Sequence, residues 1–171
     1  MTDARQAREV DPAIRRARPA EAGALSALAL RSKAHWGYDA EFLAACRDDL
    51  TISADEIENS PVYVCDGGDA PLGFYRLLLR DDGVAELDDL FVEPAAMGQG
   101  IGRSLWRHAV ATATNLGASE MVWQSDPQAE GFYLAMGARR AGESESTVTP
   151  GRMLPLLRFQ LRQEVPGSQS S

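Results

Sequence analysis

One stretch decides the fold of this chain: Glu86-Leu-Asp-Asp-Leu-Phe-Val-Glu-Pro-Ala-Ala-Met-Gly-Gln-Gly-Ile-Gly-Arg-Ser-Leu105. Residues 84–92 are rich in side chains that favour strands. Pro94 ends the strand, because proline has no N–H to donate to a ladder. From Ile101 onward the apolar residues recur at helical spacing. The stretch therefore predicts a strand, a glycine-rich loop and a helix.

The junction between this loop and the helix favours an anion. The first N–H groups of a helix have no partner inside the helix, and the helix dipole adds roughly half a positive charge there. Gly98, Gly100 and Gly102 let the backbone approach a ligand closely and tolerate positive φ. We therefore expect a phosphate or pyrophosphate at the loop. A tight turn without a ligand is the alternative.

Three kinds of phosphate-binding site can be built on a glycine-rich loop before a helix. A P-loop is excluded, because no Lys-Ser/Thr pair follows the glycines. A dinucleotide site needs an acidic residue about 20 positions downstream, which Asp126 could supply. However, the strand before the loop carries Glu86, Asp88 and Asp89, unlike the apolar strands of a parallel sheet. Coenzyme A is the third ligand.

Two motifs in this order resemble the GCN5-related N-acetyltransferase (GNAT) family. Glu-Leu-x-x-Leu-Phe-Val-x-Pro followed by x-x-Gly-x-Gly-Ile-Gly102 is similar to the family's motif A. Asp126-Pro-x-Ala-x-Gly-Phe-Tyr-x-x-Met-Gly137 is similar to its motif B. The resemblance covers roughly residues 84–142. It implies transfer of an acetyl group from acetyl-CoA to an amine in a ternary complex.

Length and composition favour one domain. The chain has 171 residues, 44% of them hydrophobic, which is enough for a real core. We expect a disordered leader at 1–11, a single N-acetyltransferase domain at 12–162 and a disordered tail at 163–171. No apolar run approaches the ~20 residues of a bilayer span, and residues 1–10 lack the apolar segment of a secretory signal. A cytoplasmic protein is expected.

Charge and the rare residue types narrow the function classes. The net charge of -8 argues against a nucleic-acid partner. Plain solubility explains this charge most simply, and attraction of cationic molecules such as amines is the alternative. Cys46 and Cys65 have no CxxC spacing, so buried, reduced thiols are expected. His35 and His108 are too few for a histidine-based metal site, and His108 is expected to be structural. No metal and no membrane partner are expected.

The remaining patterns predict a meander of antiparallel strands followed by a strand–helix–strand unit whose two strands are parallel. Short turns between the strands predicted at 61–66, 72–80 and 84–92 make them antiparallel neighbours. The helix after the glycine loop should stop at Gly117, and the strand at 119–125 should be parallel to the one before the loop. Before the meander, a strand is predicted at 13–19 and three helices follow it, at 20–32, directly after the N-cap Asp39, and at 53–58. After the strand at 119–125, a helix capped by Asp126 should end near Met136. The last two strands are predicted at 138–144 and 153–161.

These elements and the resemblance give one fold class. It is the GNAT fold, an α/β (α+β) architecture with a mixed, mostly antiparallel sheet of about six to seven strands flanked by about four helices. The resemblance also implies that the strand at 84–92 splays from the strand that follows, commonly with a β-bulge. The doubled acid Asp88-Asp89 is consistent with such a bulge.

The resemblance also implies a set of residues that bind acetyl-CoA. Backbone N–H groups of the loop would hold the pyrophosphate, and pantetheine would pair like an extra strand with the strand before it. The family usually has Arg or Gln where this chain has Met97, and many members have Asn at Asp126. The implied set is Leu90, Phe91, Val92, Met97, Gly98, Gln99, Gly100, Ile101, Gly102, Arg103, Ser104, Asp126, Phe132 and Tyr133.

Catalysis requires a base for the acceptor ammonium and an acid for the departing thiolate. The resemblance implies Glu86 as the base, acting through a water, and Tyr133 as the acid. Asp88 is the second candidate for the base, because period 2 puts it on the face of Glu86 and puts Asp89 on the other face. Alternatively, the acids bind a cationic acceptor or line a wet cleft, and Tyr133 is a packing aromatic.

The acceptor is the least determined part of the function. Trp36 and Tyr38 lie where the family's variable segment forms part of the acceptor wall, although helix packing explains them equally well. The expected acceptor is a primary amine of a small molecule, and a protein N-terminus or lysine is the alternative. Two rival functions are a non-catalytic acyl-CoA-binding module and a nicotinamide-binding oxidoreductase. Dimers are common in the family, so a homodimer is an open expectation.

Overall fold

The computed structural model describes residues 12–161. The leader and the tail expected at 1–11 and 163–171 lie outside the described residues. The elements are β1 (Ile14–Arg16), η1 (Pro19–Glu21), α1 (Ala22–Ala34), α2 (Ala40–Leu50), α3 (Ala54–Asn59), β2 (Val62–Asp66), β3 (Pro71–Leu79), β4 (Val84–Val92), η2 (Pro94–Ala96), α4 (Ile101–Asn115), β5 (Glu120–Gln124), α5 (Glu130–Ala135), β6 (Arg139–Glu145) and β7 (Met153–Gln160).

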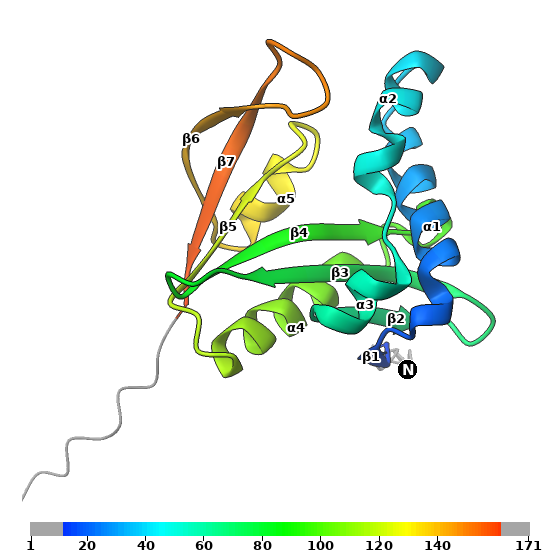
Figure 1. Cartoon of the computed structure of the whole chain (residues 1–171), viewed down its shortest axis with the longest axis horizontal. Helices are drawn as coiled ribbons and strands as arrows, with labels where there is room; N and C mark the ends of the chain where they lie inside the picture. The colour runs from blue at the N-terminus through cyan, green and yellow to red at the C-terminus, as the bar shows by residue number, and fades with distance from the viewer. Residues whose placement is uncertain (1–11, 162–171) are drawn as a thin grey trace, which may run out of the picture.

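The strands form one seven-stranded sheet in the order β1-β2-β3-β4-β5-β7-β6. Neighbouring strands are antiparallel except β4 and β5, which are parallel. The short turns after β2 and β3 produce the predicted meander, and α4 is the crossover between the parallel pair (Figure 1). The predicted fold class, a mixed and mostly antiparallel sheet flanked by helices, is confirmed.

Two apolar cores cover the two faces of the sheet. One core joins the sheet to α4 and α5, with Leu105, Trp106 and Tyr133 buried in it. The other joins the sheet to α1 and α3, with Leu25 and Ile57 fully buried. α1, α3, α4 and α5 therefore bury apolar side chains against the strands, which is the main source of their stability.

The parallel pair separates after a short contact. β4 and β5 pair at only three positions, from Val84 opposite Glu120 to Glu86 opposite Val122. β5 then follows β7 away from β4, and Figure 1 shows the two strands diverging. Within residues 12–161, no strand pairs with the β5 side of β4 from 87 to 92. The splay that the resemblance implied is confirmed, and it opens the sheet at its centre.

A β-bulge in β4 changes which side chains share a face. Asp89 lies opposite Arg76 and Leu87 lies opposite Leu77, so Asp88 is an extra residue with no partner on β3. Because of this extra residue, Glu86 and Asp89 lie on the same face of the sheet, the face of α1 and α3. The prediction that Asp89 points to the other face is therefore wrong, since simple alternation holds only for a regular strand.

The helix predicted to start at Asp126 is shorter than expected. The carbonyl of Asp126 accepts the N–H of Ala129 at 2.9 Å, and its carboxylate accepts the N–H of Gln128 at 2.9 Å. These bonds form a separate turn, and α5 begins only at Glu130. Asp126 is therefore a turn residue and not the N-cap of α5.

Other local predictions are confirmed. Asp39 caps α2 by accepting the N–H of Phe42 at 2.8 Å, and Ser53 caps the short α3. Cys46 and Cys65 are buried free thiols. Among the helices of residues 12–161, none combines the length and the apolar character needed to cross a bilayer.

Candidate active site

The glycine loop folds as a short 3-10 turn followed by two residues with positive φ. Gly98 has φ 81° and Gly100, the N-cap of α4, has φ 82°, a conformation that suits glycine. The N–H of Met97 donates to the carbonyl of Pro94 at 3.3 Å. Met97 was predicted to offer its N–H to a pyrophosphate, and this prediction is corrected because that N–H has a protein acceptor.

The next N–H groups are free to bind a ligand. Within residues 12–161, the backbone N–H groups of 98–103 donate no hydrogen bond to another protein group. They lie at the start of the fifteen-residue α4, where the dipole favours an anion. These groups fit the diphosphate of acetyl-CoA. The N–H of Ser104 donates to the carbonyl of Gly100 at 3.1 Å, so it is not one of these free groups.

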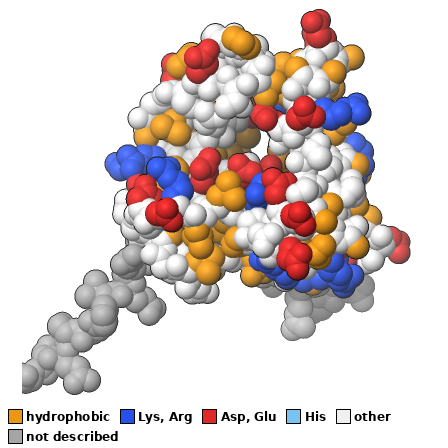
Figure 2. Space-filling view, viewed as in Figure 1, with side chains coloured by type: hydrophobic (Ala, Val, Ile, Leu, Met, Phe, Trp, Pro, Cys, Tyr) orange, Lys and Arg blue, Asp and Glu red, His pale blue; other side chains and the backbone are white. Residues whose placement is uncertain are grey.

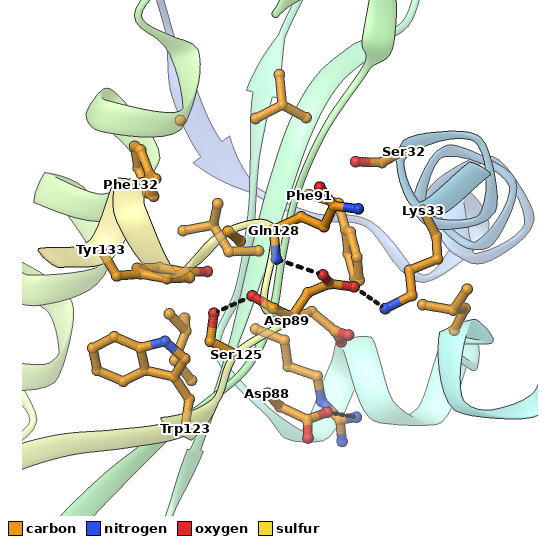
Figure 3. Close-up of a pocket in the computed structure, with 18 of the residues that line it drawn as sticks. Ser32, Lys33, Asp88, Asp89, Phe91, Trp123, Ser125, Gln128, Phe132 and Tyr133 are labelled. Atoms are coloured by element: carbon orange, nitrogen blue, oxygen red, sulfur yellow. Dashed lines mark hydrogen bonds and ion pairs between the residues drawn. The ribbon is translucent and has the colours of Figure 1, made fainter. Parts of the chain in front are cut away.

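A cavity of about 1150 Å³ runs from this loop into the opening between β4 and β5. Ligand pockets usually measure roughly 300–1000 Å³, so this one has room for part of a coenzyme and an acceptor together. Figure 3 shows its centre, where side chains from β4, β5, α1 and α5 point toward one another.

Most of the predicted site residues line this cavity. Ser104 and Tyr38 are the two predicted residues that do not. Those that do are Trp36, Glu86, Asp88, Leu90, Phe91, Val92, Met97, Gly98, Gln99, Gly100, Ile101, Gly102, Arg103, Asp126, Phe132 and Tyr133.

Tyr133 reaches the cavity from α5 and is held by aromatic neighbours. Its ring lies 5.0 Å from that of Trp123 and 5.8 Å from that of Trp106, centroid to centroid. Burial raises the pKa of Tyr133 far above its ordinary value, and the negative charge of Asp89 raises it further. The phenol therefore stays protonated at neutral pH. Its hydroxyl has no hydrogen-bond partner within residues 12–161 and is available as a proton donor.

Three carboxylates of β4 face the same cavity: Glu86, Asp88 and Asp89, here called the β4 acids. Figure 2 shows acidic side chains gathered beneath a hollow between the β5–β7 side and the α1–α2 side. Burial raises the pKa of Asp89 to about 7, and the neighbouring charge of Asp88 adds to the effect. Burial also raises the pKa of Asp88, although Arg76, at 3.2 Å, opposes that shift.

Asp126 lies at the rim of the cavity and joins the two sides of the opening. Its carboxylate accepts hydrogen bonds from Lys33 at 2.5 Å and from Tyr38 at 2.9 Å, and Arg152 donates to the Tyr38 oxygen at 3.0 Å. We call these four residues the clasp. Burial alone would raise the pKa of Asp126, but the hydrogen bond from Lys33 and that from the Gln128 N–H hold it below its ordinary value.

The clasp changes the roles predicted for two residues. Asp126 was predicted to contact the coenzyme, but its oxygens are already shared by Lys33, Tyr38 and the Gln128 N–H. Tyr38 was predicted to form the acceptor wall, and it lies in the clasp, outside the cavity lining. Trp36, in contrast, does line the cavity.

Breaking the clasp at Lys33 is expected to destabilise the protein. The side chains of Lys33 and Asp126 are only 16% and 13% exposed, so Lys33→Met would leave a largely buried carboxylate without its cation. We expect a loss of about 2 kcal/mol or more in the free energy of unfolding, measured by urea denaturation. Arg80→Met is the control, because the Arg80–Asp82 pair is about half exposed and worth at most about 1 kcal/mol. Equal losses in the two variants would contradict the role of the clasp.

Two functional features were missed from the sequence. Asp89 was placed on the wrong face, although the doubled acid within a strand was the signal of the bulge that turns it inward. Lys33 was not among the predicted site residues. Nothing in its local sequence signals an ion pair with Asp126, which lies 93 positions away.

Comparisons with known proteins agree with this geometry. The family model described as "Acetyltransferase (GNAT) family" matches residues 28–138. The peptidyl-lysine N-acetyltransferase YjaB of Salmonella typhimurium is 36% identical over 149 residues, covering 84% of this chain and 94% of that protein.

Two solved structures share the fold at lower identity. A GCN5-related N-acetyltransferase from Rhodopseudomonas palustris superposes with a TM-score of 0.72 at 20% identity, covering 88% of this chain and 96% of that one. The PaiA N-acetyltransferase of Thermoplasma acidophilum, in complex with coenzyme A, gives a TM-score of 0.67 at 19% identity, covering 86% and 98%. With the family model matching well over half of its length, the chain belongs to the acetyltransferase (GNAT) family.

Proposed function

We propose that the protein transfers an acetyl group from acetyl-CoA to the side-chain amine of a lysine in a protein or peptide. One observation carries the proposal: the free N–H groups of 98–103, the Tyr133 phenol and the β4 acids all meet in one cavity. The coenzyme would supply a thioester, and the chain would supply the groups that bind it and move protons. The name of the YjaB relative supports lysine as the acceptor.

The charges around the cavity suit an ammonium group. Seven carboxylates and three cationic side chains line it, and Lys33 and Arg76 are already paired with acids. An alkyl ammonium has an ordinary pKa of about 10.4, so it arrives charged and is attracted by this surplus of negative charge. It must then lose a proton before its nitrogen attacks.

A small free amine is the second candidate acceptor, and one feature favours it. Within the clasp, Lys33 of α1 bonds to Asp126 in the β5–α5 turn, and Arg152 in the β6–β7 loop bonds to Tyr38, between α1 and α2. Thr147 in the β6–β7 loop also donates a hydrogen bond of 3.1 Å to Asp49 of α2. Such bridges limit the width of the entrance. A lysine side chain on a flexible segment could still enter end-on, whereas a folded surface would be held back.

The acceptor can be identified with matched peptides. The purified protein would be incubated with acetyl-CoA and an N-terminally blocked peptide containing one lysine, with thiol release and peptide mass as readouts. The same peptide with arginine in place of lysine is the control, and a polyamine and an unblocked peptide test the other acceptors. Acetylation of the lysine peptide alone supports the proposal. Turnover restricted to the polyamine or the unblocked peptide would reject lysine, and coenzyme binding without turnover on any amine would favour a non-catalytic module.

The resemblance implies Glu86 as the base, and a substitution at Glu86 distinguishes that role from binding of the ammonium. If Glu86 binds the ammonium, Glu86→Gln is expected to raise the KM for the acceptor about tenfold, the size of one hydrogen bond to a charged group. If it takes the proton, the acid limb of the pH–rate profile changes instead. Glu93→Gln is the control, because Glu93 pairs with Arg31 and does not line the cavity. An unchanged KM and an unchanged profile would leave Glu86 with neither role.

A further inference from the structure

The β4 acids differ in what they contact. Asp88 accepts a hydrogen bond from Arg76 at 3.2 Å, so its charge is partly neutralised. Glu86 and Asp89 line the cavity, and neither accepts a hydrogen bond from another group within residues 12–161. A carboxylate without a protein partner is free to take a proton from a ligand, so these two are the groups to compare.

Asp89 and Glu86 differ in where they lie along β4. Glu86 is the last residue of β4 that pairs with β5, so it lies at the closed end of the opening. Asp89 follows the bulge, where β4 has already lost its β5 partner. Asp89 and Tyr133 line the same cavity, and in Figure 3 the Asp89 label stands beside the carboxylate of Asp126, the group bonded to Lys33 and to the Gln128 N–H. The effect of Asp89 on the pKa of Tyr133 shows that the two groups are electrostatically close.

From this arrangement we propose that Asp89 is the general base that takes a proton from the acceptor ammonium, with Glu86 binding the ammonium on its way in. The inference rests on the proposed function, because it assigns a role in the same reaction. Asp89 and Tyr133 approach the opening from β4 and α5, so an acyl carbon held between them has its base and its acid on separate elements.

Charged groups from several elements face Asp89 and set its titration. Those that act on its charge directly are Asp88 on β4, Arg76 on β3, Glu56 on α3 and Asp49 on α2. Tyr133 faces it from α5, and Lys33, on α1, is held by Asp126. Burial and the surrounding acids prevail over Arg76 and bring the pKa of Asp89 to about 7. A base is most effective when its pKa lies near the working pH.

The proton balance of the step is simple. Asp89 takes one proton from the ammonium, and the amine nitrogen forms a bond to the thioester carbonyl carbon. The C–S bond breaks with its electron pair on sulfur, and sulfur takes the phenol proton of Tyr133. The second proton on nitrogen returns to the Tyr133 oxygen. Asp89 then releases its proton to water, so each turnover yields an amide, a thiol and one proton.

The test compares the pH dependence of kcat/KM in three isosteric variants. At about pH 7, Asp89→Asn is expected to lower kcat by about 10²-fold or more, and the inflection near pH 7 should disappear. Glu86→Gln should keep that inflection while raising the KM for the acceptor, and Asp88→Asn should keep an inflection that moves to lower pH, because the charge of Asp88 helps to raise the pKa of Asp89. An Asp89→Asn variant with the parent's inflection and kcat would overturn the assignment. So would loss of the inflection in Glu86→Gln alone.

A stability measurement shows whether Asp89→Asn still folds. The folded pKa of Asp89, about 7, is above its ordinary 3.8, so ionised Asp89 opposes folding. This destabilisation grows as pH rises from the ordinary value through the folded value and is complete above about pH 7. Asp89→Asn should therefore raise the melting temperature at pH 8 and leave it nearly unchanged at pH 3. A lower melting temperature at pH 8 would contradict the burial of Asp89 and overturn the proposal.

The two proposals fail in different ways. If the parent protein acetylates no amine at all, the proposed function fails, and the role of Asp89 fails with it. If the parent is active and the Asp89→Asn profile matches that of the parent, only the role of Asp89 fails. Isothermal titration of acetyl-CoA into each variant shows that the coenzyme still binds, because no β4 acid belongs to the loop at 98–103.

Discussion

Replacing Tyr133 with phenylalanine is expected to lower kcat by around 10²-fold or more, a typical effect of losing a general acid. The substitution removes only the hydroxyl, so the ring can keep its contacts with Trp106, Trp123 and Phe132. The raised pKa of Tyr133 keeps the phenol protonated, so the parent has a proton to give to the departing sulfur throughout the neutral range. Phenylalanine has none, and the thiolate would have to leave unprotonated.

The measurement is steady-state kinetics at saturating acetyl-CoA and acceptor, with Tyr63→Phe as the control. Tyr63 lies on β2, stacks on Tyr75 with ring centroids 5.5 Å apart and does not line the cavity. Its variant should keep the parent's kcat. The KM for acetyl-CoA should change far less than kcat in Tyr133→Phe, because a proton donor acts mainly in the transition state. An unchanged kcat would remove Tyr133 from the role of acid.

The second large effect is expected at Gly73, where α4 approaches the sheet. A Cβ at this position would lie 2.8 Å from the Leu105 side chain, 2.8 Å from the Phe91 carbonyl oxygen and 3.3 Å from the Ile101 side chain. The carbonyl belongs to β4 and cannot rotate away. Gly73→Ala should therefore lower the free energy of unfolding by about 1–3 kcal/mol. It should also weaken acetyl-CoA binding, because the start of α4 and the glycine loop must shift together.

Gly23→Ala is the matched control for this variant. Gly23 lies in α1, and a Cβ there would meet no atom within 4 Å. Alanine in a helix is favoured over glycine by about 0.5–1 kcal/mol, so this variant should be as stable as the parent or slightly more stable. Urea denaturation and calorimetric titration of acetyl-CoA report both quantities. Gly73→Ala behaving like Gly23→Ala would show that the close approach of α4 is not needed.

Much of the fold could be predicted because its signals are local. The bounds of β4 follow from strand-forming residues before Pro94, and the start of α4 follows from the change to helical spacing at Ile101. The caps Asp39 and Ser53 act on N–H groups within three residues of themselves. The short turns around β3 determine the antiparallel meander, because a tight turn leaves a strand no other neighbour.

The candidate site was predictable only in part. The loop glycines and Tyr133 belong to contiguous motifs, so their place beside the cavity followed from the sequence order. The face of the sheet to which Asp89 points could not be predicted in this way, because one extra residue in β4 reverses the alternation of side chains. The register that creates this extra residue is set by pairing with β3. Asp126 was predicted to contact the coenzyme, because no residue near it in sequence indicates that Lys33 is its partner.

The sequence by itself determined the order of the elements, the meander, the parallel crossover and the glycine-rich loop, since each depends on propensities and turns within a few residues. Only the tertiary structure decided which carboxylate enters the cavity, which N–H groups stay free and how Lys33, Tyr38 and Arg152 meet Asp126. The physical reason is distance along the chain: burial, strand register and ion pairs join residues far apart in sequence, and their outcome exists only once the chain has folded.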